Sequence, residues 1–121
     1  MILNKILDEQ NKIAVRQEYV EVYKMVEEEI YKINHWDSCY QSVKLLDKAH
    51  TIARLSLSVD IEEYCLDLFQ KAKTINEEIK LEYKKSIDVN AHFDLTDRIK
   101  NLISNFCDTN PSEIFQKHVK L

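Results

Sequence analysis

The sequence contains no glycine and only one proline among its 121 residues. Hairpin turns and β-bulges depend on glycine for backbone conformations with positive φ, so its absence argues against a sheet protein and predicts an all-α fold. The phosphate-binding loop and the dinucleotide fingerprint also require glycine, which excludes both motifs. The single proline, Pro111, follows Asn110 in a pattern typical of a helix N-terminus.

Cysteine is sparse in this sequence, and the positive and negative charges are nearly balanced. The three cysteines lie far apart without a CxxC pair, which predicts reduced thiols in a cytoplasmic protein. The net charge is −4 with both signs interspersed, so the basic stripe needed for nucleic-acid binding is missing. The longest run of one sign, Glu27–Glu29, is interpreted as a solvated helix face. No apolar stretch has membrane-spanning length, and the start of the chain lacks a signal-peptide core.

Four long segments carry apolar residues at alternating spacings of four and three, the pattern of helices packed side by side in a bundle. Breaks at 35–38, 58–60 and 88–92 separate these segments, and a short last helix begins at Pro111. The length suits one domain. The sequence therefore predicts a single domain over residues 1–121, an antiparallel four-helix bundle with a short additional C-terminal helix.

The spacing also predicts which residues face the core. The expected positions are Val15, Tyr19, Val22, Val26, Ile30 and Ile33 in the first helix, Cys39, Val43, Leu46, His50, Ala53 and Leu57 in the second with Leu45, Ala49 and Ile52 at the side, Ile61, Cys65, Leu68, Ala72, Ile75 and Ile79 in the third, Leu95, Ile99, Leu102 and Phe106 in the fourth, and Ile114, Phe115 and Val119 in the last.

The first 14 residues do not keep the phase of this pattern. At about 100° per residue their apolar stripe lies nearly opposite the stripe that begins at Val15. Either the helix breaks near 9–12 and a short separate helix folds onto the core, or one continuous helix presents a second face to a partner. The candidate interface residues are Ile2, Leu3, Ile6, Leu7 and Ile13.

His50 is the polar member of the predicted core line in the second helix. The residues from Ala49 to Ile52 (AHTI) resemble part of the histidine phosphotransfer motif, whose phospho-accepting histidine lies in the middle of a helix in a four-helix bundle. That resemblance implies His50 as a phospho-acceptor, although Ala53 and Arg54 replace the lysine and glycine that follow in the family. The alternative is a structural core histidine with a buried partner.

Other catalytic or metal patterns are incomplete. Asp47 and His50 have the i,i+3 spacing of one di-iron ligand pair, but such bundles need a second pair and two further carboxylates. Glu18 and Glu21 resemble the first half of the magnesium-binding pattern of all-α nucleotide pyrophosphohydrolases. The resemblance ends there, because the next helix lacks the matching acidic pair. We therefore expect no catalytic residue, no metal and no cofactor.

These observations favour a small non-enzymatic interaction or regulatory protein, such as an inhibitor, a chaperone or an immunity-type factor. We expect it to bind a protein partner or a second copy of itself through apolar helix faces, and to bind neither nucleic acid nor membranes. A phosphotransfer bundle that uses His50 is the alternative.

Overall fold

The computed structural model describes residues 2–34, 39–85 and 97–119 of the chain. Every regular element in these ranges is a helix, which confirms the all-α fold. The predicted corner at 35–38, the connection at 88–92 and Leu95 lie outside the described residues. The helices in the described ranges are α1 (Ile2–Asn34), α2 (Cys39–Ser56), α3 (Val59–Lys85), α4 (Asp97–Cys107) and α5 (Pro111–Phe115).

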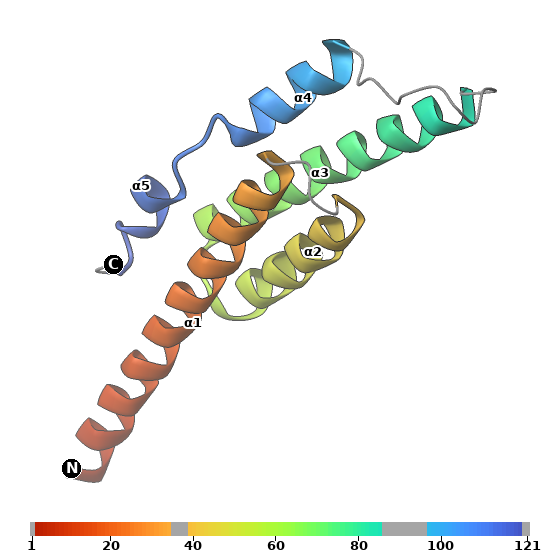
Figure 1. Cartoon of the computed structure of the whole chain (residues 1–121). Helices are drawn as coiled ribbons and strands as arrows, with labels where there is room; N and C mark the ends of the chain where they lie inside the picture. The colour runs from red at the N-terminus through yellow and green to blue at the C-terminus, as the bar shows by residue number, and fades with distance from the viewer. Residues whose placement is uncertain (1, 35–38, 86–96, 120–121) are drawn as a thin grey trace.

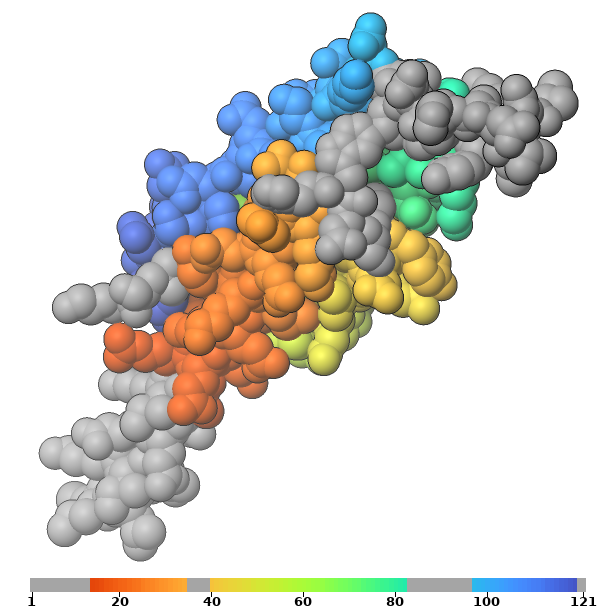
Figure 2. Space-filling model, viewed as in Figure 1, coloured from red at the N-terminus to blue at the C-terminus, as the bar shows by residue number. Residues whose placement is uncertain are grey.

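The first four helices form the predicted bundle. Figure 1 shows that α1, α2, α3 and α4 run in alternating directions. α1 and α3 each pack against both α2 and α4, which closes a ring of four helices. In Figure 2 the C-terminal half of α1 accordingly lies between α4 and α2 on the visible face. Because α5 packs against α1 and α3, the antiparallel four-helix bundle with a short C-terminal helix is confirmed.

The core-facing line of α3 lies where the spacing predicts it. Its central members are at most 1% exposed, and Ile79 is partly buried at the end of the line. Burying one isoleucine or leucine side chain contributes roughly 1.5–3 kcal/mol, so this line is a large part of the core. The fully buried members are Ile61, Cys65, Leu68, Ala72 and Ile75.

The core-facing line of α2 is rotated away from the predicted one, and the placement of His50 in its centre is wrong. Three of the four buried residues are small, which lets α2 approach its neighbours closely. Small residues contribute little to a hydrophobic pattern, so the larger residues beside them dominated the prediction. The buried residues are Ser42, Leu46, Ala49 and Ala53, while Val43, His50 and Leu57 are half-buried and the Cys39 side chain lies outside the described residues.

The core-facing line of α1 requires two corrections. Val15 is 41% exposed and does not belong to the core. Glu29 is 2% exposed and occupies the place predicted for Ile30, which is half-buried. The interpretation of Glu27–Glu29 as a solvated face is therefore wrong at its third residue. Among the side chains of α1 that the structure describes, which begin at residue 14, the buried ones are Tyr19, Val22, Val26, Glu29 and Ile33.

The C-terminal helices cover the remaining side of the core. In α4, Ile103 is buried in the place predicted for Leu102, which is half-buried. α5 begins at Pro111 as predicted, with Asn110 at the N-cap position. The Asn110 side chain makes no cap hydrogen bond; its Oδ1 accepts one from the Ser112 hydroxyl at 2.6 Å. In and after α5, Phe115 and Val119 are buried as expected, and Ile114 is half-buried.

Candidate functional site

α1 continues without a break through residues 9–12, so of the two alternatives the continuous helix is the one observed. Its core-facing line ends inside the helix, since Tyr19 is 8% exposed and Val15, one turn earlier, is 41% exposed. Figure 1 shows the turns before this point extending beyond the end of the other described helices. We call residues 2–14 the N-terminal extension.

The five residues predicted from the sequence to form an interface all lie in the N-terminal extension. Their backbone is helical, and their side chains lie outside the described residues. Whether they contact a partner stays a prediction. They are Ile2, Leu3, Ile6, Leu7 and Ile13.

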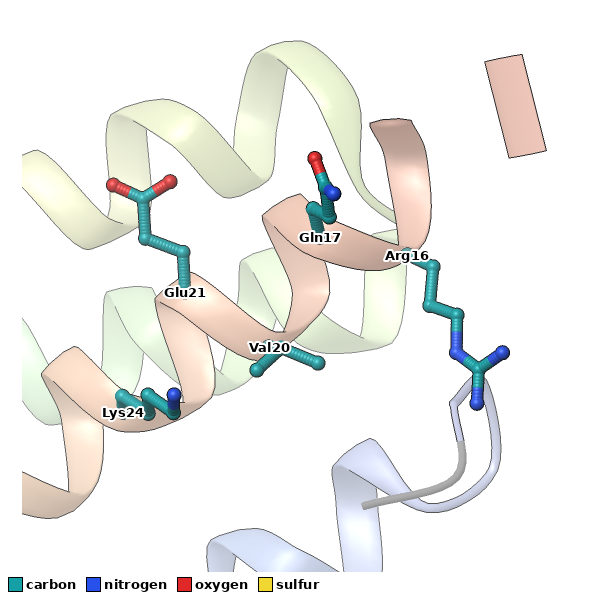
Figure 3. Close-up of a pocket in the computed structure, with 5 residues that line it drawn as sticks. All are labelled: Arg16, Gln17, Val20, Glu21 and Lys24. Atoms are coloured by element: carbon teal, nitrogen blue, oxygen red, sulfur yellow. The ribbon is translucent and has the colours of Figure 1, made fainter. Parts of the chain in front are cut away.

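The outer face of α1, next to the extension, carries a shallow depression of about 390 Å³. All the described side chains that line it come from this one helix, as Figure 3 shows. Val20 is half-buried at its centre, and the charged and amide side chains around it are exposed. The lining residues are Arg16, Gln17, Val20, Glu21 and Lys24.

Two exposed apolar residues flank the turn between α2 and α3. Leu55 is 74% exposed and Val59 is 66% exposed. The same turn contacts α1 where the core begins, because the Ser58 backbone N–H donates a hydrogen bond of 3.1 Å to the Tyr19 hydroxyl. Both residues therefore flank a turn at the end of the bundle from which the extension emerges.

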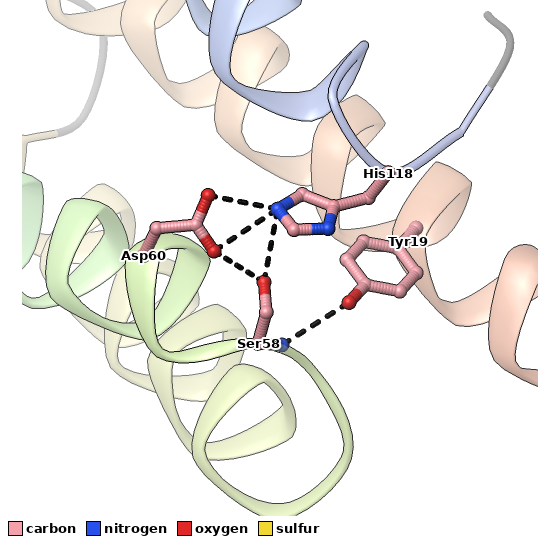
Figure 4. A network of polar contacts seen from close by, with 4 residues as sticks. All are labelled: Tyr19, Ser58, Asp60 and His118. Atoms are coloured by element: carbon pink, nitrogen blue, oxygen red, sulfur yellow. Dashed lines mark hydrogen bonds and ion pairs between the residues drawn. The ribbon is translucent and has the colours of Figure 1, made fainter.

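A polar network at this end joins three parts of the chain (Figure 4). The Nε2 atom of His118, which follows α5, lies 2.7 and 3.0 Å from the two carboxylate oxygens of Asp60 in the first turn of α3. The Ser58 hydroxyl contacts the same carboxylate and lies 3.1 Å from Nε2. The imidazole also stacks on the Tyr19 ring of α1, with 5.2 Å between the centroids. The network therefore ties the C-terminal segment to α1 and α3.

The chemistry of this network is structural. Serine, histidine and aspartate also form hydrolase triads, in which the two ring nitrogens of histidine contact different partners. Here one nitrogen faces both Ser58 and Asp60, and a carboxylate only accepts hydrogen bonds, so Nε2 carries the proton and cannot act as a base for Ser58. Although desolvation raises the pKa of Asp60, the hydrogen bonds from His118 and Ser58 outweigh it and lower the pKa to about 2.

No local sequence pattern indicates this network. The sequence predicts a break between helices at 58–60, but His118 lies 58 residues after Asp60. The predicted break at 58–60 extends too far, because α3 begins at Val59 and Asp60 lies in its first turn. Only the folded chain brings the two ends of this ion pair together.

His50 lies at the edge of the contact between α2 and α3. Its side chain is 15% exposed, and its Nε2 atom is enclosed without a hydrogen-bond partner among the described residues. The nearest carboxylate oxygen, Glu62 Oε1, is 3.7 Å away, which is too long for a hydrogen bond. A phosphoryl donor needs open access to the accepting nitrogen, so this enclosure does not favour the phospho-acceptor hypothesis.

Among the described side chains, the polar residues buried in the core are Glu29 and Ser42. Glu29 Oε2 and Ser42 Oγ have no hydrogen-bond partner among the described residues, while Lys32 Nζ lies 3.3 Å from Glu29 Oε1. Desolvation raises the pKa of Glu29, and the hydrogen bond from Lys32 opposes part of that rise. The signal that could have found Glu29 is its place on the line through Val22, Val26 and Ile33.

The described cysteines are free but poorly reactive. Burial raises the pKa of the Cys65 thiol to about 12 and also raises the pKa of Cys107, which disfavours the nucleophilic thiolate in both. Within the described ranges, no three histidine, cysteine, aspartate or glutamate residues gather where they could hold a metal ion. In those same ranges, none of the helices combines the length and apolarity needed to cross a membrane.

Comparisons with protein-family models, with curated proteins and with solved structures give no match to this chain.

Proposed function

We propose that this chain is a small cytoplasmic interaction protein whose activity is binding rather than catalysis, and that its binding surface is the N-terminal extension of α1. The observation that carries the proposal is the continuity of α1: the helix persists beyond the point where its core-facing line ends. A helical segment of this length is marginal in water by itself. Packing of the remainder of α1 keeps it helical and presents it at one end of the bundle.

The residue pattern of the extension supports a protein partner. Its five apolar positions recur at helical spacings, which is how an amphipathic helix lies in a partner's groove. A bundle that presents such a helix can act as a regulator, an inhibitor or a chaperone without chemistry of its own. The free thiols of Cys65 and Cys107 support the cytoplasmic part of the proposal.

The test is the double substitution Ile6→Asp/Leu7→Asp. We expect it to abolish association, whether with a protein captured from a cell extract or with a second copy, while circular dichroism shows an unchanged bundle. The matched control is Leu81→Asp, because Leu81 is 49% exposed near the C-terminal end of α3, far from the extension. This control should bind as the wild type does.

Two results would overturn the proposal. Association that survives the double substitution would place the binding surface elsewhere. Loss of helicity together with association would show that the extension is part of the core.

A further inference from the structure

The outer face of α2 carries a line of mostly exposed residues. The helix packs against α1 and α3 through its buried line, which begins at Ser42 and ends at Ala53. At about 100° per residue, a second line with spacings of four, four, three and four points nearly opposite to the buried one. We call this second line the α2 stripe, and its members are Tyr40, Lys44, Lys48, Thr51 and Leu55.

Exposed apolar side chains lie at the two ends of the α2 stripe. Tyr40 is 55% exposed in the first turn of the helix, and Leu55 is 74% exposed in the last. They are 15 residues apart, which corresponds to about 22 Å of helix at 1.5 Å per residue. Two apolar contacts at this separation suit a second helix that lies along α2 for about four turns.

The charge of α2 is positive. Its three cations and one carboxylate give the helix a net charge of +2 in a chain of net charge −4. By contrast, α1 and α3 each have seven acidic and five basic residues. In the described part of the chain, Lys48 and Arg54 are exposed and belong to no ion pair. The charged residues of α2 are Lys44, Asp47, Lys48 and Arg54.

Two ammonium groups converge on the ring of Tyr40. Lys44 Nζ lies 4.6 Å from the ring centroid, and Lys80 Nζ, which comes from α3, lies 5.7 Å from it. Both distances are within the range of a cation–π contact. The hydrogen bond and charge of Lys44 lower the pKa of Tyr40, and the charge of Lys80 adds to this effect although desolvation opposes it. An aromatic contact and two cations are therefore held together before any partner arrives.

We propose that the α2 stripe is a docking surface for an acidic helix of a protein partner. The apolar side chains of that helix contact Tyr40 and Leu55, and its carboxylates face Lys44 and Lys48 between them. Charge complementarity selects this occupant, because the stripe presents positive charge on a protein that is acidic as a whole. The inference goes beyond the proposed function, since the N-terminal extension belongs to α1 and α2 begins at the other end of the bundle (Figure 1).

The composition of the stripe favours a protein over other polyanions. Nucleic-acid binding takes many phosphate contacts, whereas the stripe has two lysines, with Asp47 beside them. A helix that lies on a membrane is apolar along one whole face, whereas the α2 stripe is apolar only at its ends. Carboxylates between apolar contacts complement this order of residues directly.

The test is the binding of two synthetic helical peptides to the full chain, followed by fluorescence anisotropy in about 50 mM NaCl. Both have about 16 residues with leucine near each end, and the residues between are glutamate in one and lysine in the other. We expect the glutamate peptide to bind with a dissociation constant below about 100 μM, and the lysine peptide not to bind. Lys44→Glu/Lys48→Glu should weaken binding of the glutamate peptide at least about tenfold, because two attractive contacts become repulsive.

The matched control is Lys71→Glu/Lys100→Glu, which changes the net charge by the same amount. Both lysines are exposed. Lys71 lines a depression between α3 and α4, and Lys100 belongs to α4, so both lie away from α2. This control should bind the glutamate peptide as the wild type does. Circular dichroism should show unchanged helicity in both variants, since exposed substitutions cost little stability.

Three results would overturn the proposal. The first is no binding of the glutamate peptide up to about 1 mM, and the second is an equal loss in the α2 variant and the control. The third is tighter binding of a DNA duplex, or of vesicles of phosphatidylcholine and phosphatidylserine, than of the peptide. Ile6→Asp/Leu7→Asp should leave peptide binding unchanged, so failure of the docking surface and failure of the proposed function are detected with different variants.

Discussion

The two halves of α1 belong to the same helix but are held in different ways. From Tyr19 to Ile33 the helix buries a line of side chains against its neighbours, whereas residues 2–14 extend beyond the end of the other described helices. Starting a helix is costly and lengthening one is not, so a packed half can support an unpacked continuation. Helix formation and burial are therefore separate properties in α1. The helix is long because its sequence contains no glycine or proline, whereas the positions of the other helices decide which part of it is core.

The largest expected effect lies on the packed side of this comparison. Phe106 in α4 is fully buried, so Phe106→Ala should lower the free energy of unfolding by about 3–5 kcal/mol through lost contacts and a residual cavity. Leu81→Ala, at a residue that is 49% exposed near the end of α3, should cost less than about 0.5 kcal/mol. Urea denaturation measures both. Equal losses for the two variants would contradict the assignment of the core.

How much of the fold the sequence predicts depends on the size of the buried side chains. In α3 the buried residues include Ile61, Leu68 and Ile75, so the spacing of apolar residues coincides with the buried face. In α2 the buried face includes Ser42 and Ala49, which have weak hydrophobic signals, and the larger residues at the edge shifted the prediction toward His50.

The candidate site divides in a similar way. The out-of-phase stripe of the extension is a local pattern, and the sequence alone indicated it. The contact between Asp60 and His118 depends on how α5 returns to the start of α3, and no periodicity encodes that. Buried Glu29 lay within an acidic run whose first two residues, Glu27 and Glu28, are exposed, so its neighbours in sequence concealed its position on the core line.

The second prediction replaces the buried carboxyl group of the packed half. Glu29→Leu should stabilise the protein by about 1–2 kcal/mol at pH 7, because an enclosed carboxylate oxygen without a partner is removed and Lys32 keeps its ion pair of 3.3 Å with Glu28. Burial raises the pKa of Glu29 above its ordinary value of 4.5, so the wild type is relatively more stable below pH 4.5 and loses that advantage as the pH rises through the raised pKa.

The gain from Glu29→Leu should therefore be smaller at pH 4 than at pH 7 in urea denaturation. A variant that is less stable than the wild type at pH 7 would show that the carboxylate has a stabilising partner in the folded protein.

A smaller effect is expected where the C-terminal segment joins the bundle. The Asp60 pKa is lowered from 3.8 to about 2, so its contribution is present above pH 3.8 and disappears as the pH falls through about 2. Asp60→Asn should cost about 1 kcal/mol or less at pH 6, because the Asp60 and His118 side chains are 46% and 24% exposed and solvent screens the pair. The cost should vanish near pH 2.

The matched control for Asp60→Asn is Asp67→Asn. Asp67 forms an ion pair within α3, with Lys71 at 2.9 Å, so its loss should cost a few tenths of a kcal/mol. Denaturation between pH 2 and pH 7 measures both variants. Equal costs at pH 6 would mean that the link between α3 and the C-terminal segment does not stabilise the fold.

The smallest effect on stability, and the sharpest test of the comparison, comes from removing the unpacked half of α1. A variant that begins at Val15 should unfold within about 0.5 kcal/mol of the full chain, because the core line starts at Tyr19 and the removed turns lie beyond the other described helices. Light scattering should nevertheless show that the same variant has lost association. A stability loss above about 2 kcal/mol would instead mean that the extension packs on the core, since helix propensity alone cannot supply that amount from a segment of this length. If the packed half of α1 serves folding and the extension serves binding, removing the extension must abolish association and leave stability nearly unchanged.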